Sequence, residues 1–401
     1  MKRHLRTALT AATAVALTAA LAAPALAAPS DGGHDATRQA VRAAVADGVP
    51  GVTMTVRRGH GTWAATAGVG NLKTGKPRST ADHYRVGSIT KTFVATVLLQ
   101  LEAEGKLSLD DTVEKWLPGL VRGNGHDGRK VTLRRLLNHT SRIYDYLDDT
   151  GFQQKYMTAD GFMKHRFDEA TPEELLAFAM ANEPYPESDE PFNYSNTNYV
   201  LAARVIEKAT GGDDYGDEIE RRIIAPLHLT STSVPTTRVT LPRPSSRTYS
   251  KLVKPDVGGP TYDVTELNPR LAYGSGQMVS SSADLTRFYS ALLRGRLLPP
   301  EQLKEMKTTV PSSRDTSRYG LGLVDRELSC GVHVWGNDGG IFGSNSDAVT
   351  TDDGRHSLAV NFNGDWSGST DAIIEAEFCA GRGALPVAQQ ATRMVPGPVG
   401  S

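Results

Sequence analysis

The sequence has little that would place the protein in a membrane or on a nucleic acid. After the first 27 residues, no segment approaches the roughly 18 consecutive apolar residues that a membrane-spanning helix needs. Positive charge is not in excess either, because 44 Lys and Arg residues are balanced by 45 Asp and Glu residues. We therefore expect a soluble mature protein with no membrane span and no nucleic-acid partner.

Several catalytic signatures are missing as well. The chain contains no Gly-x-Ser-x-Gly motif, which argues against an α/β-hydrolase. Its histidines lack the spacing of zinc ligands, so we expect neither a metal nor another cofactor. We predict that four of them are loop or surface residues, namely His126, His139, His333 and His356.

The N-terminus has the pattern of a secretory signal peptide. Lys2, Arg3 and Arg6 precede an apolar run over 8–23, and a site of small residues ends at Ala27. A charged start, an apolar middle and a small-residue exit favour export over a short core helix. We predict a signal peptide over 1–27 and a secreted protein, whose formal net charge changes from −1 to −4 when the three cations leave.

Cysteine is scarce: the chain has only Cys330 and Cys379. An exported chain meets an oxidising compartment, so we predict a disulfide between them. The alternative is a pair of buried free thiols. Closing a loop of about 50 residues would stabilise the fold by roughly 4 kcal/mol in the chain-entropy model, less any strain.

Hydrophobic periodicity predicts sheet at both ends of the chain and helices between. The strand patterns lie at 52–57, 62–70, 332–335, 346–350 and 357–362. The helix patterns begin at Ser88, Thr171, Thr197 and Ser281. Turn residues separate these segments, and Thr171 is followed by a first-turn proline, which is typical of a helix start.

These patterns predict an α/β fold in which an antiparallel sheet is flanked by helices and built discontinuously. The expected parts are an α/β sheet domain from 28–115 and 270–382, a mostly helical insertion at 116–269 and a tail at 383–401. The tail lacks periodicity and is expected to be disordered.

Ser88-Ile89-Thr90-Lys91 is the only Ser-x-x-Lys string in the chain, and it lies where a strand pattern changes to a helix. Positions i and i+3 share one face of a helix, so the Lys91 amine can reach the Ser88 hydroxyl and activate it as a nucleophile. The helix N-terminus also favours negative charge on the serine oxygen. The alternative is an N-cap serine beside a solvated lysine.

Tyr194-Ser195-Asn196 is the only Tyr-x-Asn string, and it precedes a predicted helix. A phenol near a lysine can relay protons, and the Asn196 amide can hold a substrate carbonyl and orient Lys91. The alternative is a core tyrosine followed by an asparagine that caps the helix.

Three segments together resemble the penicillin-recognising serine hydrolases: RVGSITK at 85–91, VTLRRLLNHTS at 131–141 and YSNTN at 194–198. The chain is most similar to the secreted D-alanyl-D-alanine carboxypeptidases, with class C β-lactamases, D-aminopeptidases and esterases as cousins. The resemblance covers nearly the whole mature chain. It extends to YGLGL at 319–323 and LSCG at 328–331, and in the carboxypeptidase group the two cysteines pair.

The resemblance implies a β-lactamase-like fold and a role for each matching residue. Ser88 would be the nucleophile, Lys91 its activator, and Tyr194 the group that returns the proton to the leaving group. Asn196 would hold a substrate amide. The backbone N–H groups of Ser88 and of the strand near Gly340 would bind the oxyanion, which is usually the largest catalytic contribution.

The third motif of the family departs from its pattern. It normally reads Lys or His, then Thr or Ser, then Gly, on the edge strand beside the nucleophile. A literal Lys73-Thr74-Gly75 precedes Ser88, and we interpret it as a decoy. The matching positions, which we take as substrate-binding candidates, are Asn337, Asp338, Gly339 and Gly340, the last in place of the usual threonine.

The arginine that binds the substrate carboxylate in the carboxypeptidases is replaced by Val324, and Arg142 stands where glycine is usual. An ionised Asp338 would repel a substrate carboxylate unless Arg326 or Arg142 pairs with it. We therefore expect peptides with a free D-Ala carboxylate and ordinary penicillins to react poorly, and esters, amides or amine-bearing substrates to react better.

The leading hypothesis is a serine hydrolase of the D-alanyl-D-alanine carboxypeptidase type that acts on cell-wall peptides through an acyl-enzyme. An esterase or D-aminopeptidase with the same core is a second hypothesis, and a non-catalytic binder of wall peptides or penicillin is a third. The expected partner is in each case a small peptide, ester or β-lactam, and we expect a monomer. The accepted acyl group, and the fate of β-lactams, stay open at this point.

Overall fold

The computed structural model describes residues 33–189, 191–212, 214–252, 258–312 and 317–381. The predicted signal peptide at 1–27 and the predicted tail at 383–401 lie outside the described residues. From Asp35 onward the described residues belong to one unit.

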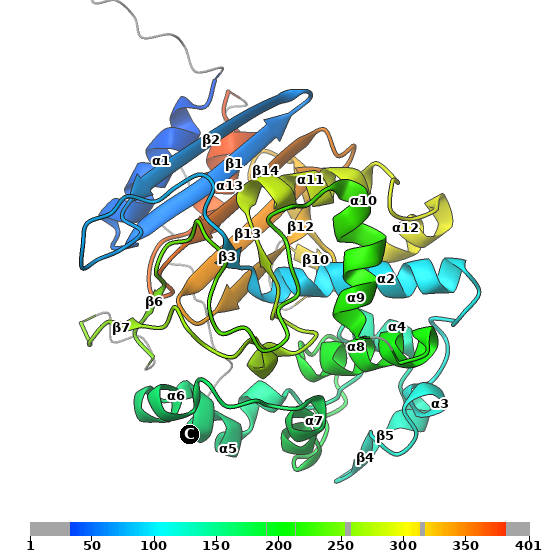
Figure 1. The fold of residues 1–401 in the computed structure, drawn as a ribbon. Helices are drawn as coiled ribbons and strands as arrows, with labels where there is room; N and C mark the ends of the chain where they lie inside the picture. The colour runs from blue at the N-terminus through cyan, green and yellow to red at the C-terminus, as the bar shows by residue number, and fades with distance from the viewer. Residues whose placement is uncertain (1–32, 190, 213, 253–257, 313–316, 382–401) are drawn as a thin grey trace, which may run out of the picture. The chain divides into compact units, whose positions relative to one another are not determined.

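An eight-stranded antiparallel sheet lies at the centre of this unit and confirms the predicted fold class (Figure 1). In spatial order its strands are β2 (Gly61–Gly68), β1 (Gly51–Arg58), β14 (His356–Phe362), β13 (Ser344–Thr351), β12 (His333–Ile341), β11 (Val324–Glu327), β10 (Ser317–Tyr319) and β9 (Val310–Pro311). The two ends of the chain meet where β1 pairs with β14, with Val52 opposite Phe362 and Val56 opposite Leu358. The sheet therefore joins the N-terminal hairpin to the C-terminal strands.

Helices cover both faces of the sheet. On one face Val52, Met54 and Val56 pack with the apolar sides of α1 (Asp35–Ala46) and α13 (Thr370–Phe378). On the other face α11 (Ser282–Leu293) packs across β1, β13 and β14, where Ala348 and Ala359 leave room for a close helix. The alternation of side chains along each strand decides which residues meet which layer.

The remaining helices lie between the two sheet-forming segments of the chain (Figure 1). They are α2 (Thr90–Ala103), α3 (Val113–Trp116), α4 (Leu133–Leu137), α5 (Thr150–Phe152), α6 (Ala159–His165), α7 (Pro172–Met180), α8 (Thr197–Thr210), α9 (Tyr215–Ile219), α10 (Ala225–Leu227) and, before β9, α12 (Pro300–Met306). Two-stranded ladders join β3 (Tyr84–Arg85) to β8 (Val279–Ser280), β4 (Arg122–Gly123) to β5 (His126–Asp127), and β6 (Tyr249–Ser250) to β7 (Tyr262–Asp263). The division into a sheet domain and an insertion with the boundaries given above stays a prediction.

Short sequence motifs predicted the start of α7 and the end of α8 correctly. The side chain of Thr171 accepts a hydrogen bond from the Glu174 backbone and the Glu174 side chain accepts one in return, a capping box at the start of α7. Gly211 ends α8 in the left-handed conformation that glycine adopts without strain. The strand expected at 332–335 was too short, because β12 continues to Ile341 through three glycines of low strand propensity that pairing with β13 holds extended.

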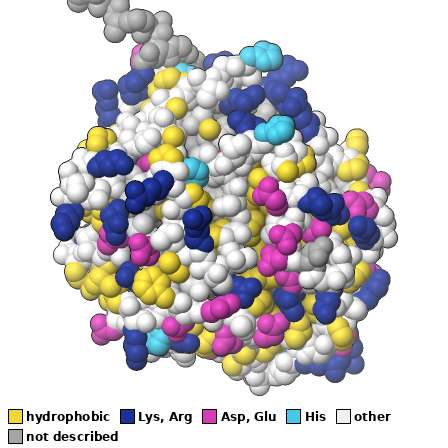
Figure 2. All heavy atoms as spheres, in the orientation of Figure 1, with side chains coloured by type: hydrophobic (Ala, Val, Ile, Leu, Met, Phe, Trp, Pro, Cys, Tyr) yellow, Lys and Arg dark blue, Asp and Glu magenta, His cyan; other side chains and the backbone are white. Residues whose placement is uncertain are grey.

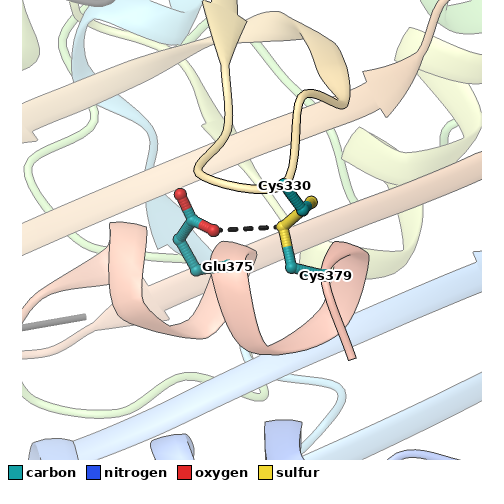
Figure 3. Close-up of side chains that lie close together, drawn as sticks. All are labelled: Cys330, Glu375 and Cys379. Atoms are coloured by element: carbon teal, nitrogen blue, oxygen red, sulfur yellow. Dashed lines mark hydrogen bonds between the residues drawn. A yellow bond between two sulfur atoms is a disulfide. The ribbon is translucent and has the colours of Figure 1, made fainter. Parts of the chain in front are cut away.

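The structure contains the predicted disulfide between Cys330 and Cys379, which joins the turn after β11 to the end of α13 (Figure 3). Glu375 holds the same turn, since its carboxylate accepts hydrogen bonds from the backbone and hydroxyl of Ser329 at 2.9 and 2.7 Å. Another contact places a Glu375 oxygen 3.1 Å from the Cys379 sulfur. The two cysteines and Glu375 have donor types that suit a metal, but a disulfide has no thiolate to offer one.

Within the part of the chain that the structure describes, no helix is long and apolar enough to cross a membrane.

Candidate active site

Ser88 lies in a 3₁₀ turn, Gly87–Ile89, that leads directly into α2. The preceding Gly87 has φ +54°, and a Cβ on it would lie 2.8 Å from both the N and O atoms of Gly340 on β12. Only glycine allows this turn to approach the strand so closely. The Ser88 side chain makes no capping hydrogen bond at the start of α2 and is partly exposed, so the N-cap alternative for Ser88 is wrong.

Lys91 lies one helical turn after Ser88 and is fully buried. Its Nζ is 2.9 Å from Ser88 Oγ, 2.8 Å from Asn196 Oδ1 and 2.9 Å from the backbone oxygen of Ser275. A neutral amine has two hydrogens and one lone pair. Because Asn196 and Ser275 offer only acceptors here, the two hydrogens go to them and the lone pair is left pointing at the Ser88 hydroxyl.

Burial lowers the pKa of Lys91 from 10.5 to about 7, and the nearby carboxylates of Asp145 and Asp338 oppose this shift. A base with a pKa near the working pH is available in its neutral form and still accepts a proton readily. Lys91 can therefore remove the proton from Ser88. This excludes the solvated-lysine alternative, since the side chain has no contact with solvent.

Tyr194 approaches the same serine from the loop before α8. Its hydroxyl donates a 2.8 Å hydrogen bond to Ser88 Oγ, and 36% of the residue is exposed. The surroundings of the hydroxyl withhold water and hold the pKa of Tyr194 well above 10, so the phenol keeps its proton. Tyr194 thus presents a proton donor to the Ser88 hydroxyl, and because the residue is partly exposed it is not a core tyrosine.

The imidazole ring of His139 packs against the phenol ring of Tyr194. The rings lie 4.2 Å apart between centroids, and His139 is completely buried. Its Nδ1 accepts hydrogen bonds from the Ser195 backbone and the Asn198 amide, at 3.1 and 3.2 Å, which leaves the proton on Nε2 beside Tyr319. Burial also lowers its pKa well below 6.5, so the ring is neutral. The prediction of a loop or surface histidine was wrong for His139, and also for His126, which is buried in strand β5.

Asn196 bridges Lys91 to a buried carboxylate. Its Oδ1 accepts from Lys91, and its Nδ2 donates a 2.7 Å hydrogen bond to Asp145 Oδ2. The Asn196 side chain does not cap α8, so that alternative is also wrong. Burial raises the pKa of Asp145 from 3.8 to about 6. The Asp145 carboxylate can only accept, so the NH₂ group of the Asn196 side chain must point at it. The carbonyl oxygen of the same side chain is then left facing Lys91.

The open edge of β12 lies beside Ser88. The neighbouring strand β11 pairs with β12 only from His333 to Gly336, so the edge from Asn337 onward has no strand partner there among the described residues. A Cβ on Gly339 would lie 2.0 Å from the Val86 oxygen and 2.7 Å from the Ser88 nitrogen. The structure therefore brings the backbone of Gly339 and Gly340 against the nucleophile, whereas Lys73-Thr74-Gly75 lies in an exposed turn.

Asp338 stands opposite Asp347 in the sheet register, close enough to Lys91 for its charge to raise the pKa of the lysine. Arg326 donates to Asp347 at 2.8 Å and to Asp371 at 3.0 Å. Arg142 has φ +65°, a conformation that explains the usual glycine, and its guanidinium binds Glu187. The charge of Arg326 therefore acts on Asp347, Asp371 and Asp338, whereas Arg142 is bound by Glu187.

Val324 is buried on β11, at the position where the carboxypeptidases carry their arginine. It offers a substrate carboxylate no hydrogen bond. Of the departures noted in the sequence, Asp338 and Gly340 therefore lie on the open edge of β12, and Val324 lies on the adjacent strand β11.

The sequence did not predict three of the groups at the site: Asp145, His139 and the backbone oxygen of Ser275. Asp145 had a local signal, since it follows the HTS segment by a few residues and precedes a short turn that it caps. Ser275 had none, because any residue supplies a backbone carbonyl. Only the fold shows that they converge on Lys91.

Replacing Asp145 with asparagine should move the pH dependence of turnover. Asparagine has one side-chain oxygen, so it can accept either from Asn196 or from the Leu147 backbone but not from both, and it removes a charge that raises the pKa of Lys91. Lys91 must be neutral to act as a base, so activity falls as pH drops through its pKa. We expect the acid limb of kcat/KM to move to lower pH by about half a unit or more.

The control for this measurement is Asp148→Asn, a neighbouring carboxylate that accepts from Tyr185 and not from Asn196. It should leave the acid limb in place. A uniform loss of kcat in Asp145→Asn with an unmoved limb would show that Asp145 has only a structural role.

Comparison with known proteins gives a consistent result. The family model described as Beta-lactamase matches residues 37–373. A D-stereospecific amidohydrolase from Streptomyces sp. has a solved structure that is 57% identical, with a TM-score of 0.82 over 86% of this chain and 98% of that chain. The D-amino acid amidase from Ochrobactrum anthropi SV3, complexed with L-phenylalanine amide, is 28% identical, with a TM-score of 0.73 and the same coverage of both chains.

Among curated proteins, Penicillin-binding protein 4* of Bacillus subtilis (strain 168) is 30% identical over 286 residues, which is 68% of this chain and 59% of that protein. Putative penicillin-binding protein PbpX of the same strain is 28% identical, over 69% of this chain and 62% of that protein. The chain thus spans about three fifths of each of these relatives.

Proposed function

The chain belongs to the beta-lactamase family of penicillin-recognising serine hydrolases, and we propose that within this family it is an exported amidohydrolase for D-configured substrates. In this proposal it cleaves amide bonds of D-amino acid derivatives or short D-peptides through an acyl-enzyme on Ser88. This is the D-aminopeptidase alternative to the carboxypeptidase hypothesis. The 57% identity to a D-stereospecific amidohydrolase over nearly its whole length supports it.

Acylation would begin with neutral Lys91. As Ser88 Oγ attacks the substrate carbonyl carbon, its proton moves to the Lys91 lone pair, and the carbonyl oxygen becomes an oxyanion. The N–H groups of Ser88 and of the β12 edge at Gly340 are the candidate donors to that oxyanion. Tyr194 then gives its phenolic proton to the leaving nitrogen, the C–N bond breaks, and Lys91 restores the proton to Tyr194.

Deacylation would reverse these roles with water as the nucleophile. The water proton moves to the Lys91–Tyr194 pair, the hydroxide adds to the ester carbon, and Ser88 leaves with a proton. The substrate acid is released and the starting protonation state returns. No step needs a cofactor, because one base of suitable pKa and one phenol move every proton.

The observation that carries the choice of amide over free acid is the set of charges around the β12 edge. Asp338, Asp347 and Asp371 surround the single guanidinium of Arg326, so this region has more negative than positive charge. Two like unit charges about 8 Å apart repel by roughly 2 kcal/mol at an effective dielectric near 20, about a 30-fold loss in binding. A leaving group with a free carboxylate would meet this repulsion, and an amide or amine would not.

The test is a matched pair of substrates that differ in one charge: an acylated D-Ala-D-Ala peptide with a free carboxylate and the same peptide as its C-terminal amide. We expect kcat/KM to favour the amide by about tenfold or more. Asp338→Asn should reduce this ratio of kcat/KM for the amide to kcat/KM for the free acid, because it removes one of the repelling charges. Asp338→Thr combined with Val324→Arg should raise kcat/KM for the free acid about tenfold and leave a neutral ester nearly unchanged.

The same panel should include a D-amino acid amide and its L enantiomer, where we expect turnover of the D form. If the free-acid peptide is cleaved efficiently and Asp338→Asn does not change its kcat/KM, the carboxypeptidase hypothesis is supported instead. If no substrate is turned over and none forms a covalent adduct, the hypothesis of a non-catalytic binder is supported instead.

A further inference from the structure

A second charged cavity lies away from Ser88 and shares no residue with the site above. It has a volume of about 320 Å³ and lies between the end of the β1–β2 hairpin, the end of α10 and the last turns of α11. Four arginines and two histidines line it: Arg57, Arg287, Arg294, Arg296, His60 and His228. None of its lining residues is acidic.

Three of the four arginines have no hydrogen-bond or close ion-pair partner among the described residues, although the charge of Arg294 acts on the Asp353 carboxylate. In the described part of the chain, the guanidinium groups of Arg57, Arg294 and Arg296 make no hydrogen bond or ion pair, whereas most other arginines here are paired. Arg287 donates to the His228 backbone oxygen at 2.6 Å and lies 3.6 Å from Asp284. That carboxylate is already occupied, because it accepts from Ser231 and Thr232.

The cluster is assembled from parts of the chain that are far apart in sequence. Figure 2 shows Lys or Arg and His side chains gathered at the upper right of the molecule, over the hairpin tip and the ends of α10 and α11. His228 ends α10 with φ +52°, a left-handed conformation that costs energy for a residue with a Cβ. This conformation directs the backbone oxygen of His228 toward Arg287, which donates a hydrogen bond to it.

We propose that this cavity binds an anionic ligand that carries phosphate groups. The lining holds four arginines and no carboxylate, and the neighbouring Asp284 and Asp353 offset only part of this charge, so the arrangement is stabilised when an anion enters. Guanidinium groups match the oxygens of phosphate with paired, charge-assisted hydrogen bonds. The volume of the cavity exceeds that of a single phosphate ion, and arginines from β1, from α11 and from the turn after α11 line it, which favours a ligand with more than one phosphate group.

Titration calorimetry at low ionic strength with inorganic phosphate, tripolyphosphate and citrate tests this proposal. We expect tripolyphosphate to bind at least about tenfold more tightly than inorganic phosphate or citrate, because it offers several tetrahedral oxyanions to the arginines. Binding should weaken as salt is added, since the contacts are ionic. Tight binding of inorganic phosphate alone would identify a site for a single phosphate group and overturn the multiply phosphorylated ligand.

The triple variant Arg57→Gln, Arg294→Gln, Arg296→Gln should lose at least about tenfold in affinity for tripolyphosphate. The matched control, Arg42→Gln, Lys208→Gln and Arg238→Gln, removes the same charge from exposed positions elsewhere and should bind like wild type. Unchanged ester turnover in both variants verifies folding. Equal affinity in the cavity variant and wild type, equal loss in the control, or no binding at millimolar tripolyphosphate would each overturn the proposal.

Discussion

Replacing Ser88 with alanine is expected to abolish turnover of every substrate and to remove any covalent adduct. Ser88 has the only serine hydroxyl in the described residues that lies within hydrogen-bond distance of both a buried lysine amine and a tyrosine hydroxyl. Without it, Lys91 has no hydroxyl to activate. Loss of a serine nucleophile typically costs about 10⁴-fold or more in kcat, and intact-mass spectrometry after mixing with an activated ester would show no acyl-enzyme.

The matched control is Ser195→Ala, which changes a serine next to Tyr194. The Ser195 hydroxyl is buried and has no hydrogen-bond partner in the described structure, so its removal should be neutral or slightly stabilising. This variant should keep both turnover and adduct. If Ser88→Ala keeps even a tenth of the activity while Ser195→Ala loses it, the nucleophile has been assigned wrongly.

Lys91→Ala and Tyr194→Phe should each lower kcat by about 100-fold or more, the usual scale for a group that transfers protons in catalysis. Both side chains contact the same oxygen, Ser88 Oγ, at 2.9 and 2.8 Å. We therefore expect them to serve one proton path, in which the loss of either side chain stops proton transfer. We expect the double variant to be barely worse than the poorer single variant.

Steady-state kinetics of the two single variants and the double variant decide this point. Effects that simply multiply would mean that lysine and tyrosine act on separate steps. Tyr185→Phe is the control, because Tyr185 donates to Asp148 and does not contact Ser88. It should leave kcat close to that of wild type.

Local sequence determined those parts of the protein that depend on neighbours within a few residues. Ser88 and Lys91 lie three positions apart at the start of a helix, so their approach follows from helix geometry alone. The capping box at Thr171, the end of α8 at Gly211 and the alternation of β1 are of the same kind. The departures at Val324, Asp338 and Gly340 were also visible, because each stands at a defined distance from a recognisable motif.

The tertiary structure decided how these pieces meet. Lys91 reaches Asn196 and Ser275 across 105 and 184 residues of chain, and Tyr194 reaches Ser88 across 106. Such contacts depend on packing that no local pattern encodes. The burial that lowers the pKa of Lys91, the role of Asp145, and the engagement of Arg326 by Asp347 follow from it. The sequence named the reacting groups, and the fold determined their distances, solvent exposure and charges, because those properties arise from all the elements packed around them.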